Sequence, residues 1–221
     1  MKNILQYQDL VGIPVVESGE PMVIVQVEAP EILCRYEKTD MIPYLGHDFA
    51  LRVGAVERLR RAAARLQELR PGDKLRLVYG YRHPDVQSSY FEQRKREVSE
   101  RSPELSGDQL VAKTHLLTAS PDVAGHPTGG AIDVTIEGSE GPLDMGSGIA
   151  DFTNNKIETF ADGLTRVQRE NRELLRAVLL QSGFTPFDGE WWHFSYGDRE
   201  WAAYYGNPNA IYDQIRFENK K

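Results

Sequence analysis

The chain of 221 residues contains five histidines, and two of them stand in patterns that could bind a metal. His126 lies in "GHPTGGAID", where Gly129 and Gly130 let the chain turn from a loop into the strand expected to carry Asp133. His193 lies in "EWWHFS", a composition typical of a separate strand. Two imidazoles and one carboxylate suit catalytic zinc, which takes three protein ligands and keeps a fourth position for water. His126, Asp133 and His193 are therefore the predicted zinc ligands.

A hydrolytic zinc site also needs a base and a cation. Glu190 precedes His193 by three residues, so it would reach the attacking water if the strand begins with a bend. Arg82 follows "KLRLVYGY", a strand predicted over residues 74–81 and broken at Gly80. A guanidinium at that strand end could donate a hydrogen bond to a developing oxyanion. We therefore predict Glu190 as the catalytic base and Arg82 as the oxyanion stabiliser.

Each of these motifs, taken alone, also fits a purely structural interpretation. A histidine in a glycine-rich loop is commonly a surface residue, and an aspartate after Gly-Gly-Ala is commonly a turn or capping residue. The stretch "EWWHF" also fits a packed aromatic strand, and Arg82 also fits a solvated arginine. The spacing of the residues therefore leaves both interpretations open.

Two amphipathic helices are predicted to support these strands. The first is capped by Asp48 and ends before Pro71, and its apolar residues recur at spacings of three and four: Phe49, Val53, Val56, Leu59, Ala63 and Leu66. The second is closed by Gly183 and has the apolar residues Leu164, Val167, Leu174, Leu175, Val178 and Leu179. Alternation within "WWHFS" would place Trp191 and His193 on one face, opposite Trp192 and Phe194.

The remaining segments are predicted from residue type. They are a strand followed by a loop (22–36), a polar helix (86–99), an irregular region (100–130), a strand (131–136) and a long loop (137–155). This order of elements predicts an α+β fold, a single domain over residues 1–221 in which helices pack on a small antiparallel sheet that carries the zinc site.

Composition limits the partners and the compartment. The formal net charge of −7 argues against a general affinity for nucleic acid or anionic membranes. Cys34 is the single cysteine, so an intramolecular disulfide and a thiolate metal cage are excluded, and we expect this thiol to be buried. The N-terminal sequence has no signal-peptide pattern, and no run of about 18 apolar residues occurs. We therefore expect a cytoplasmic protein; an oligomeric state is not indicated.

The motifs in their order resemble the zinc D,D-peptidases, which share the pattern S-x-H-x-x-G-x-A-x-D followed by E-x-W-H. More narrowly, the chain is similar to the D-alanyl-D-alanine dipeptidases of that family. The resemblance runs from about residue 75 to 196 and rests on "GYR" (80–82), "AIDVT" (131–135), "MGS" (145–147) and "EWWHF" (190–194). The first 70 residues match only loosely.

This resemblance implies one Zn²⁺ per chain with the same three ligands, and the same roles for Glu190 and Arg82. It also implies that an aspartate shortly after "MGS" binds the free amino group of the substrate, and Asp151 in "MGSGIADF" is the best match. The chain departs from the family pattern at Ala124, where the usual residue is a serine. That serine is expected to help bind the substrate's backbone or carboxylate, so its absence bears on carboxylate recognition and rate.

The expected function is zinc-dependent hydrolysis of D-Ala-D-Ala to free D-alanine, with this small dipeptide as the partner. Two alternatives stay open. One is a D,D-carboxypeptidase or endopeptidase that acts on peptidoglycan peptides with the same zinc site. The other is a zinc-stabilised binding module without catalysis, which retention of both Glu190 and Arg82 disfavours and Ala124 favours.

Overall fold

The fold is built on a mixed sheet that carries both ligand strands. The structure, a computed structural model, describes residues 4–219. The sheet has the strand order β2–β4–β5–β8–β7, with β6 paired to β5, and a separate two-stranded sheet joins β1 to β3. The strands are β1 (Met22–Ile24), β2 (Leu33–Cys34), β3 (Ala50–Arg52), β4 (Lys74–Tyr79), β5 (Ala131–Gly138), β6 (Gly141–Pro142), β7 (Thr185–Pro186) and β8 (His193–Ser195).

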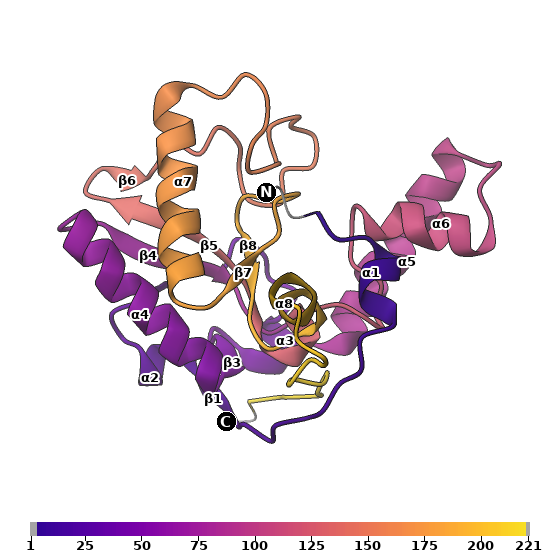
Figure 1. Cartoon of the computed structure of the whole chain (residues 1–221), viewed down its shortest axis with the longest axis horizontal. Helices are drawn as coiled ribbons and strands as arrows, with labels where there is room; N and C mark the ends of the chain where they lie inside the picture. The colour runs from indigo at the N-terminus through magenta and orange to yellow at the C-terminus, as the bar shows by residue number, and fades with distance from the viewer. Residues whose placement is uncertain (1–3, 220–221) are drawn as a thin grey trace.

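Helices surround this sheet. They are α1 (Tyr7–Val11), α2 (Val25–Glu28), α3 (Ile42–Leu45), α4 (Val53–Leu69), α5 (Pro84–Arg101), α6 (Gly107–His115), α7 (Arg166–Gln181) and α8 (Arg199–Tyr205), with a short 3₁₀ helix η1 (His126–Thr128). Helices α4 and α7 lie side by side on one side of the molecule, and α5 with α6 projects on the opposite side (Figure 1). Among the described residues, none of these helices combines the length and the apolar character that crossing a bilayer requires.

The alternation of residues in the central strand separates the core from the site. Ile132, Val134 and Ile136 of β5 belong to the main hydrophobic cluster, together with residues of α4 and α7. Asp133 lies between two of these core residues in sequence, so its side chain points to the other face of the sheet. The pairing of β5 with β4 and β8 is antiparallel, whereas β2 runs parallel to β4. The predicted α+β class with helices packed on a small sheet is confirmed, but the sheet is mixed and not wholly antiparallel, because β2 runs parallel to β4.

Several of the predicted elements differ in the structure, including the loop predicted over residues 137–155, which contains the end of β5 and strand β6. The helix predicted from Asp48 begins at Val53, because residues 50–52 form β3 and pair with β1. The segment predicted as one strand and a loop (22–36) also contains the short helix α2. The region predicted as irregular (100–130) contains α6 and η1. In each case hydrogen bonds or packing between segments decide the conformation, and such contacts cannot be predicted from the residue types of one segment.

The start of "EWWHFS" also differs from the prediction. Strand β8 begins only at His193, and the two tryptophans before it lie in a turn. The alternation predicted through Trp191 and Trp192 therefore does not hold. Trp192 lines the same cavity as His193, whereas the indole Nε1 of Trp191 donates a hydrogen bond of 2.9 Å to Ser147.

Candidate active site

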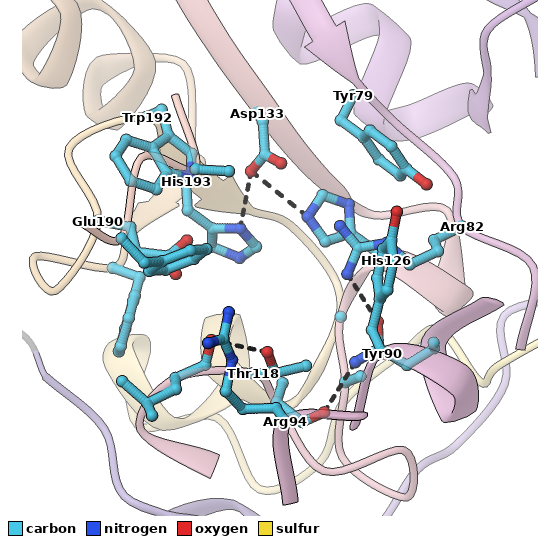
Figure 2. A pocket seen from close by; sticks show the side chains of 18 of the residues that line it. Tyr79, Arg82, Tyr90, Arg94, Thr118, His126, Asp133, Glu190, Trp192 and His193 are labelled. Carbon is cyan, nitrogen blue, oxygen red and sulfur yellow. Dashed lines mark hydrogen bonds and ion pairs between the residues drawn. The ribbon is translucent and has the colours of Figure 1, made fainter. Parts of the chain in front are cut away.

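The three predicted ligands converge where β5 and β8 lie side by side. Asp133 and His193 are directly opposite each other in the antiparallel register. Asp133 Oδ1 lies 3.1 Å from His193 Nδ1 and 3.4 Å from His126 Nε2, and all three side chains are buried. The ligand atoms of this group lie within 4.8 Å of one another (Figure 2). Ligands about 2.1 Å from a tetrahedral zinc ion lie about 3.4 Å apart, so the cluster has the dimensions of a zinc site.

His126 presents one defined nitrogen to the cluster. Its Nδ1 lies 2.7 Å from the carbonyl oxygen of Gly80, and because a carbonyl can only accept, Nδ1 carries the proton. The lone pair of Nε2 then faces Asp133 and is free for a metal. Burial lowers the pKa of His126, which favours the neutral ring that metal binding requires.

Glycines shape the turn that carries His126 toward β5. Gly129 ends η1 with a φ of 75°, in the left-handed region. A Cβ added to Gly130 would lie 2.1 Å from the backbone oxygen of Tyr196, so only glycine lets these two segments of the backbone approach this closely. The sequence predicted that this glycine pair turns the chain into the Asp133 strand. The structure requires glycine at the first position for its backbone conformation and at the second for lack of space.

The N-terminal part of the chain holds this turn in place. Buried Arg52 donates from Nε to the carbonyl oxygen of Thr128 at 3.0 Å, and its backbone N–H donates to Gly129 O at 2.9 Å. Its guanidinium also pairs with Glu17 at 3.1 Å. Sequence reasoning did not identify Arg52, because its partners are supplied by distant segments.

Electrostatics favour an ionised Asp133 within the cluster. Burial alone would raise the pKa of Asp133, but the imidazoles of His126 and His193 outweigh this effect and hold the pKa well below its usual range. The cluster therefore offers a carboxylate anion and, once His193 has lost its Nδ1 proton, two nitrogen lone pairs. This donor set fits divalent zinc.

A cavity of about 320 Å³ opens beside the cluster. Glu190 and Arg82, the predicted base and oxyanion stabiliser, both line it. In Figure 2, Glu190 lies beside His193 and Arg82 lies beside His126. Burial raises the pKa of Glu190 to about 7, so its carboxyl group could exchange a proton near neutral pH. The structure therefore brings five of the predicted site residues together, and their roles stay predictions.

Arg82 is held by groups that the sequence did not indicate. Its guanidinium carbon lies 4.5 Å from the ring centroid of Tyr79 and 5.3 Å from that of Tyr90. Both phenol groups donate hydrogen bonds to Asp40 Oδ2. Arg82 also donates to Gln87 Oε1 at 2.8 Å. Gln87 follows Arg82 by five residues in "RHPDVQ" and lies in the first turns of α5, and this short separation is the one local signal that could have identified it.

Asp151 occupies a different position from the other predicted residues. The cavity is lined by its neighbours Ala150 and Phe152, but Asp151 is not among the lining residues. Its carboxylate instead accepts a hydrogen bond of 2.6 Å from Thr153 Oγ1. Ala150 has a φ of 55°, a left-handed conformation that is rare outside glycine. The predicted contact of Asp151 with a substrate ammonium stays a prediction.

Other polar residues of the cavity were missed from the sequence. Lys38 comes from the segment before α3, Arg94 from α5 and Glu200 from α8. Ala124, which stands where the family pattern has serine, is buried and also lines the cavity. Lys38 and Arg94 lie on segments far from the ligand motifs in sequence, so no spacing along the chain links them to the site, whereas Glu200 follows His193 by only seven residues.

Two histidines and an aspartate beside a carboxylate and an arginine, in a cavity on an α+β fold, define a site of the metallopeptidase class. A model of the family Peptidase M15, described as D-ala-D-ala dipeptidase, matches residues 54–214. The match covers well over half of the chain, so the chain belongs to this family. Family membership together with the His-Asp-His cluster confirms the predicted enzyme class, a zinc metallopeptidase.

The chain is also similar to curated relatives named D-alanyl-D-alanine dipeptidase. The relative from Synechocystis is 28% identical over 93% of this chain and 94% of its own length. The relative from Escherichia coli is 33% identical over 41% of this chain and 56% of its own length, and that from Enterococcus faecium is 29% identical over 50% of each.

Comparison with solved structures gives weaker matches. A vancomycin resistance D,D-pentapeptidase, VanY, solved as a complex with Zn(II), aligns with a TM-score of 0.42 and 17% identity over 74% of this chain and 81% of its own. The LD-carboxypeptidase LdcB aligns with a TM-score of 0.48 and 20% identity over 89% of this chain and 76% of its own.

Proposed function

We propose that this protein hydrolyses the free dipeptide D-Ala-D-Ala to two molecules of D-alanine, with one zinc ion held by His126, Asp133 and His193. The observation that supports this most is the convergence of these three side chains beside the cavity, with Asp133 Oδ1 3.1 Å and 3.4 Å from the two imidazoles. The names of the curated relatives support the choice of substrate. We further propose that residues 1–221 act as a single catalytic domain.

The side chains around the cluster suggest how the peptide bond is cleaved. Zinc held there would polarise the scissile carbonyl and lower the pKa of a water molecule. Glu190 accepts a proton from the attacking water, whose oxygen forms a bond to the carbonyl carbon. Arg82 donates hydrogen bonds to the oxyanion that develops. Glu190 then delivers the proton to the leaving nitrogen as the C–N bond breaks, which regenerates the carboxylate.

Recognition of a free dipeptide requires partners for its two charged ends. Asp151 is proposed to pair with the ammonium group, which would need its carboxylate to turn from Thr153 toward the cavity. Lys38 and Arg94 line the cavity and carry positive charge that can attract the carboxylate where Ala124 supplies no hydroxyl. This arrangement would favour a substrate with both termini free.

One observation favours a second candidate, a D,D-carboxypeptidase or endopeptidase that acts on longer peptidoglycan peptides. Because the Asp151 carboxylate accepts a hydrogen bond from Thr153 and does not line the cavity, nothing at that point rejects a substrate whose amine is blocked. The cavity would then accept D-Ala-D-Ala at the end of a longer peptide.

A substrate panel with metal analysis tests the proposal. The purified protein is assayed for zinc content and for release of D-alanine from D-Ala-D-Ala, N-acetyl-D-Ala-D-Ala and a pentapeptide ending in D-Ala-D-Ala. The proposed dipeptidase cleaves the first and spares the other two. Equal cleavage of all three would favour the carboxypeptidase, and absence of both zinc and activity would refute the metalloenzyme. The cytoplasmic location stays a prediction that fractionation of the source cells tests.

A further inference from the structure

Glu200 lies on the side of His193 that faces away from the proposed metal position. Its Oε2 is 3.5 Å from His193 Nε2, whereas His193 Nδ1 is the nitrogen that faces Asp133. Among the described residues, His193 Nε2 has no hydrogen-bond partner. The carboxylate of Glu200 is therefore the acceptor that this buried N–H faces.

Glu200 is buried, so its carboxylate needs a polar partner within the protein. Its side chain is 11% exposed, and among the described residues its one ion pair is with His193. A buried carboxylate is costly unless a hydrogen-bonding or charged group offsets its loss of hydration. In the part of the chain that the structure describes, no lysine or arginine forms an ion pair with Glu200, so the imidazole of His193 is the cationic or hydrogen-bonding group that faces this buried acid.

The short connection between strand β8 and helix α8 fixes where Glu200 lies relative to His193. Asp198 caps α8, with its Oδ1 accepting hydrogen bonds from Trp201 N and Ser195 Oγ, each at 2.9 Å. Ser195 is the last residue of the strand that begins with His193. One short connection thus links the histidine to the glutamate seven residues later, and the cap fixes the first turn of the helix.

We propose that Glu200 is a positioning residue that accepts a hydrogen bond from His193 Nε2–H and thereby commits Nδ1 to the zinc ion. Partners of this kind fix the tautomer and the ring orientation of a histidine ligand and increase its basicity. Glu200 is not placed to bind the ion itself, because it faces the opposite nitrogen of the ring. This inference rests on the zinc site of the proposed function.

Zinc affinity tests the role apart from catalysis. Glu200→Ala and Glu200→Gln are compared with the wild type by competition with a chromophoric chelator at fixed pH. We expect zinc to bind roughly 10- to 100-fold more weakly to the Ala variant, the usual scale for loss of such a partner. The zinc affinity of the Gln variant should lie between those of the wild type and the Ala variant, because its amide oxygen still accepts the hydrogen bond but carries no charge. Glu97→Ala, which removes another cavity carboxylate paired with Arg94, should bind zinc as the wild type does.

Two further measurements separate positioning from a general structural role. The melting temperature of each metal-free variant shows whether it is folded, and zinc affinity is compared only among folded variants. Imidazole ¹⁵N shifts of the zinc-loaded wild type should show His193 protonated at Nε2 and coordinated through Nδ1. Coordination through Nε2, or an affinity in a folded Ala variant within about twofold of the wild type, would overturn the inference. A wild type that binds no zinc would refute the metal site itself.

Discussion

The Nδ1 atom of His126 lies 2.7 Å from the carbonyl oxygen of Gly80, so the loop that carries the first proposed ligand is joined to the strand end that precedes Arg82. This contact links two motifs that are 46 residues apart in the sequence. It also determines that Nε2, and not Nδ1, is available for a metal. The backbone N–H of Arg82 also donates to the carbonyl oxygen of His126 at 3.2 Å, so two hydrogen bonds join the segments that carry the proposed ligand and the proposed oxyanion stabiliser.

Removal of either histidine should abolish metal retention and activity together. His126→Ala or His193→Ala leaves two ligands, too few for tight binding of catalytic zinc. We expect less than stoichiometric zinc by elemental analysis and no recovery of activity when zinc is added. His47→Ala is the matched control, because His47 is exposed and does not line the cavity. Full zinc content in His193→Ala would contradict this ligand assignment.

Treatment of the wild type with a chelator should give an inactive protein that zinc reactivates. The metal is expected to stabilise the folded state, because the free energy of its binding adds to that of folding. The melting temperature should therefore fall on metal removal and rise again on addition of zinc. An unchanged melting temperature and unchanged activity after complete removal would argue for catalysis without a metal.

Glu190→Gln should keep the zinc and the fold but lose most turnover. The amide cannot accept the proton of the attacking water, and general acid–base catalysis typically contributes about 10² to 10⁴ in rate. Zinc content and kcat are measured on the same preparation. An active Gln variant would place the base elsewhere, and loss of zinc would instead make Glu190 a ligand.

Arg82→Ala should lower kcat by about 10² to 10³, the scale of losing one oxyanion donor. Gln87→Ala tests the support of that arginine, because it removes the acceptor at 2.8 Å without removing the guanidinium. Its effect on kcat should be smaller, about tenfold, the scale of one hydrogen bond to a charged group. If Arg82→Ala instead changes mainly KM, the arginine binds the substrate carboxylate and not the transition state.

The sequence was most informative where a few residues of special chemistry lie close together. The Gly-Gly turn before Asp133 and the placement of Arg82 just after a strand break at Gly80 are local features, and the structure has both. The helix start at Asp48 was wrong because β3 pairs with a strand nearly thirty residues earlier. Asp40 could not be predicted, because it reaches Arg82 only through the packing of a distant segment, and Glu200, although it is only seven residues from His193, belongs to no motif that marks it.

Cys34 provides a test of packing away from the site. The sequence predicts a buried thiol, and the structure places it partly buried in β2 against the main core. Burial raises the pKa of Cys34 from about 9 to about 12. Because the thiolate is the reactive form, alkylation of the native protein by iodoacetamide at pH 8 should be at least about 100-fold slower than that of the unfolded protein. The native rate should rise with pH beyond pH 9; equal rates in both states would show an accessible thiol.

Asp151→Asn tests how the enzyme distinguishes a free dipeptide from a blocked one. If Asp151 pairs with the substrate ammonium, the variant should have a higher KM for D-Ala-D-Ala, because a charge-assisted hydrogen bond becomes a neutral one. The ratio of kcat/KM for D-Ala-D-Ala to kcat/KM for N-acetyl-D-Ala-D-Ala should fall at the same time. The reason is that the variant has no carboxylate that the blocked amine would leave unpaired.

Asp144→Asn is the control for this substitution, because it changes another aspartate of the same loop. Its carboxylate accepts hydrogen bonds from Gly146 N at 2.9 Å and Gln168 Nε2 at 3.0 Å, and it does not line the cavity. We expect it to alter stability slightly and to leave the ratio of the two substrates unchanged. If Asp151→Asn behaves in the same way, Asp151 serves only the turn that ends at Thr153, and the amine must be bound by a different group of the cavity.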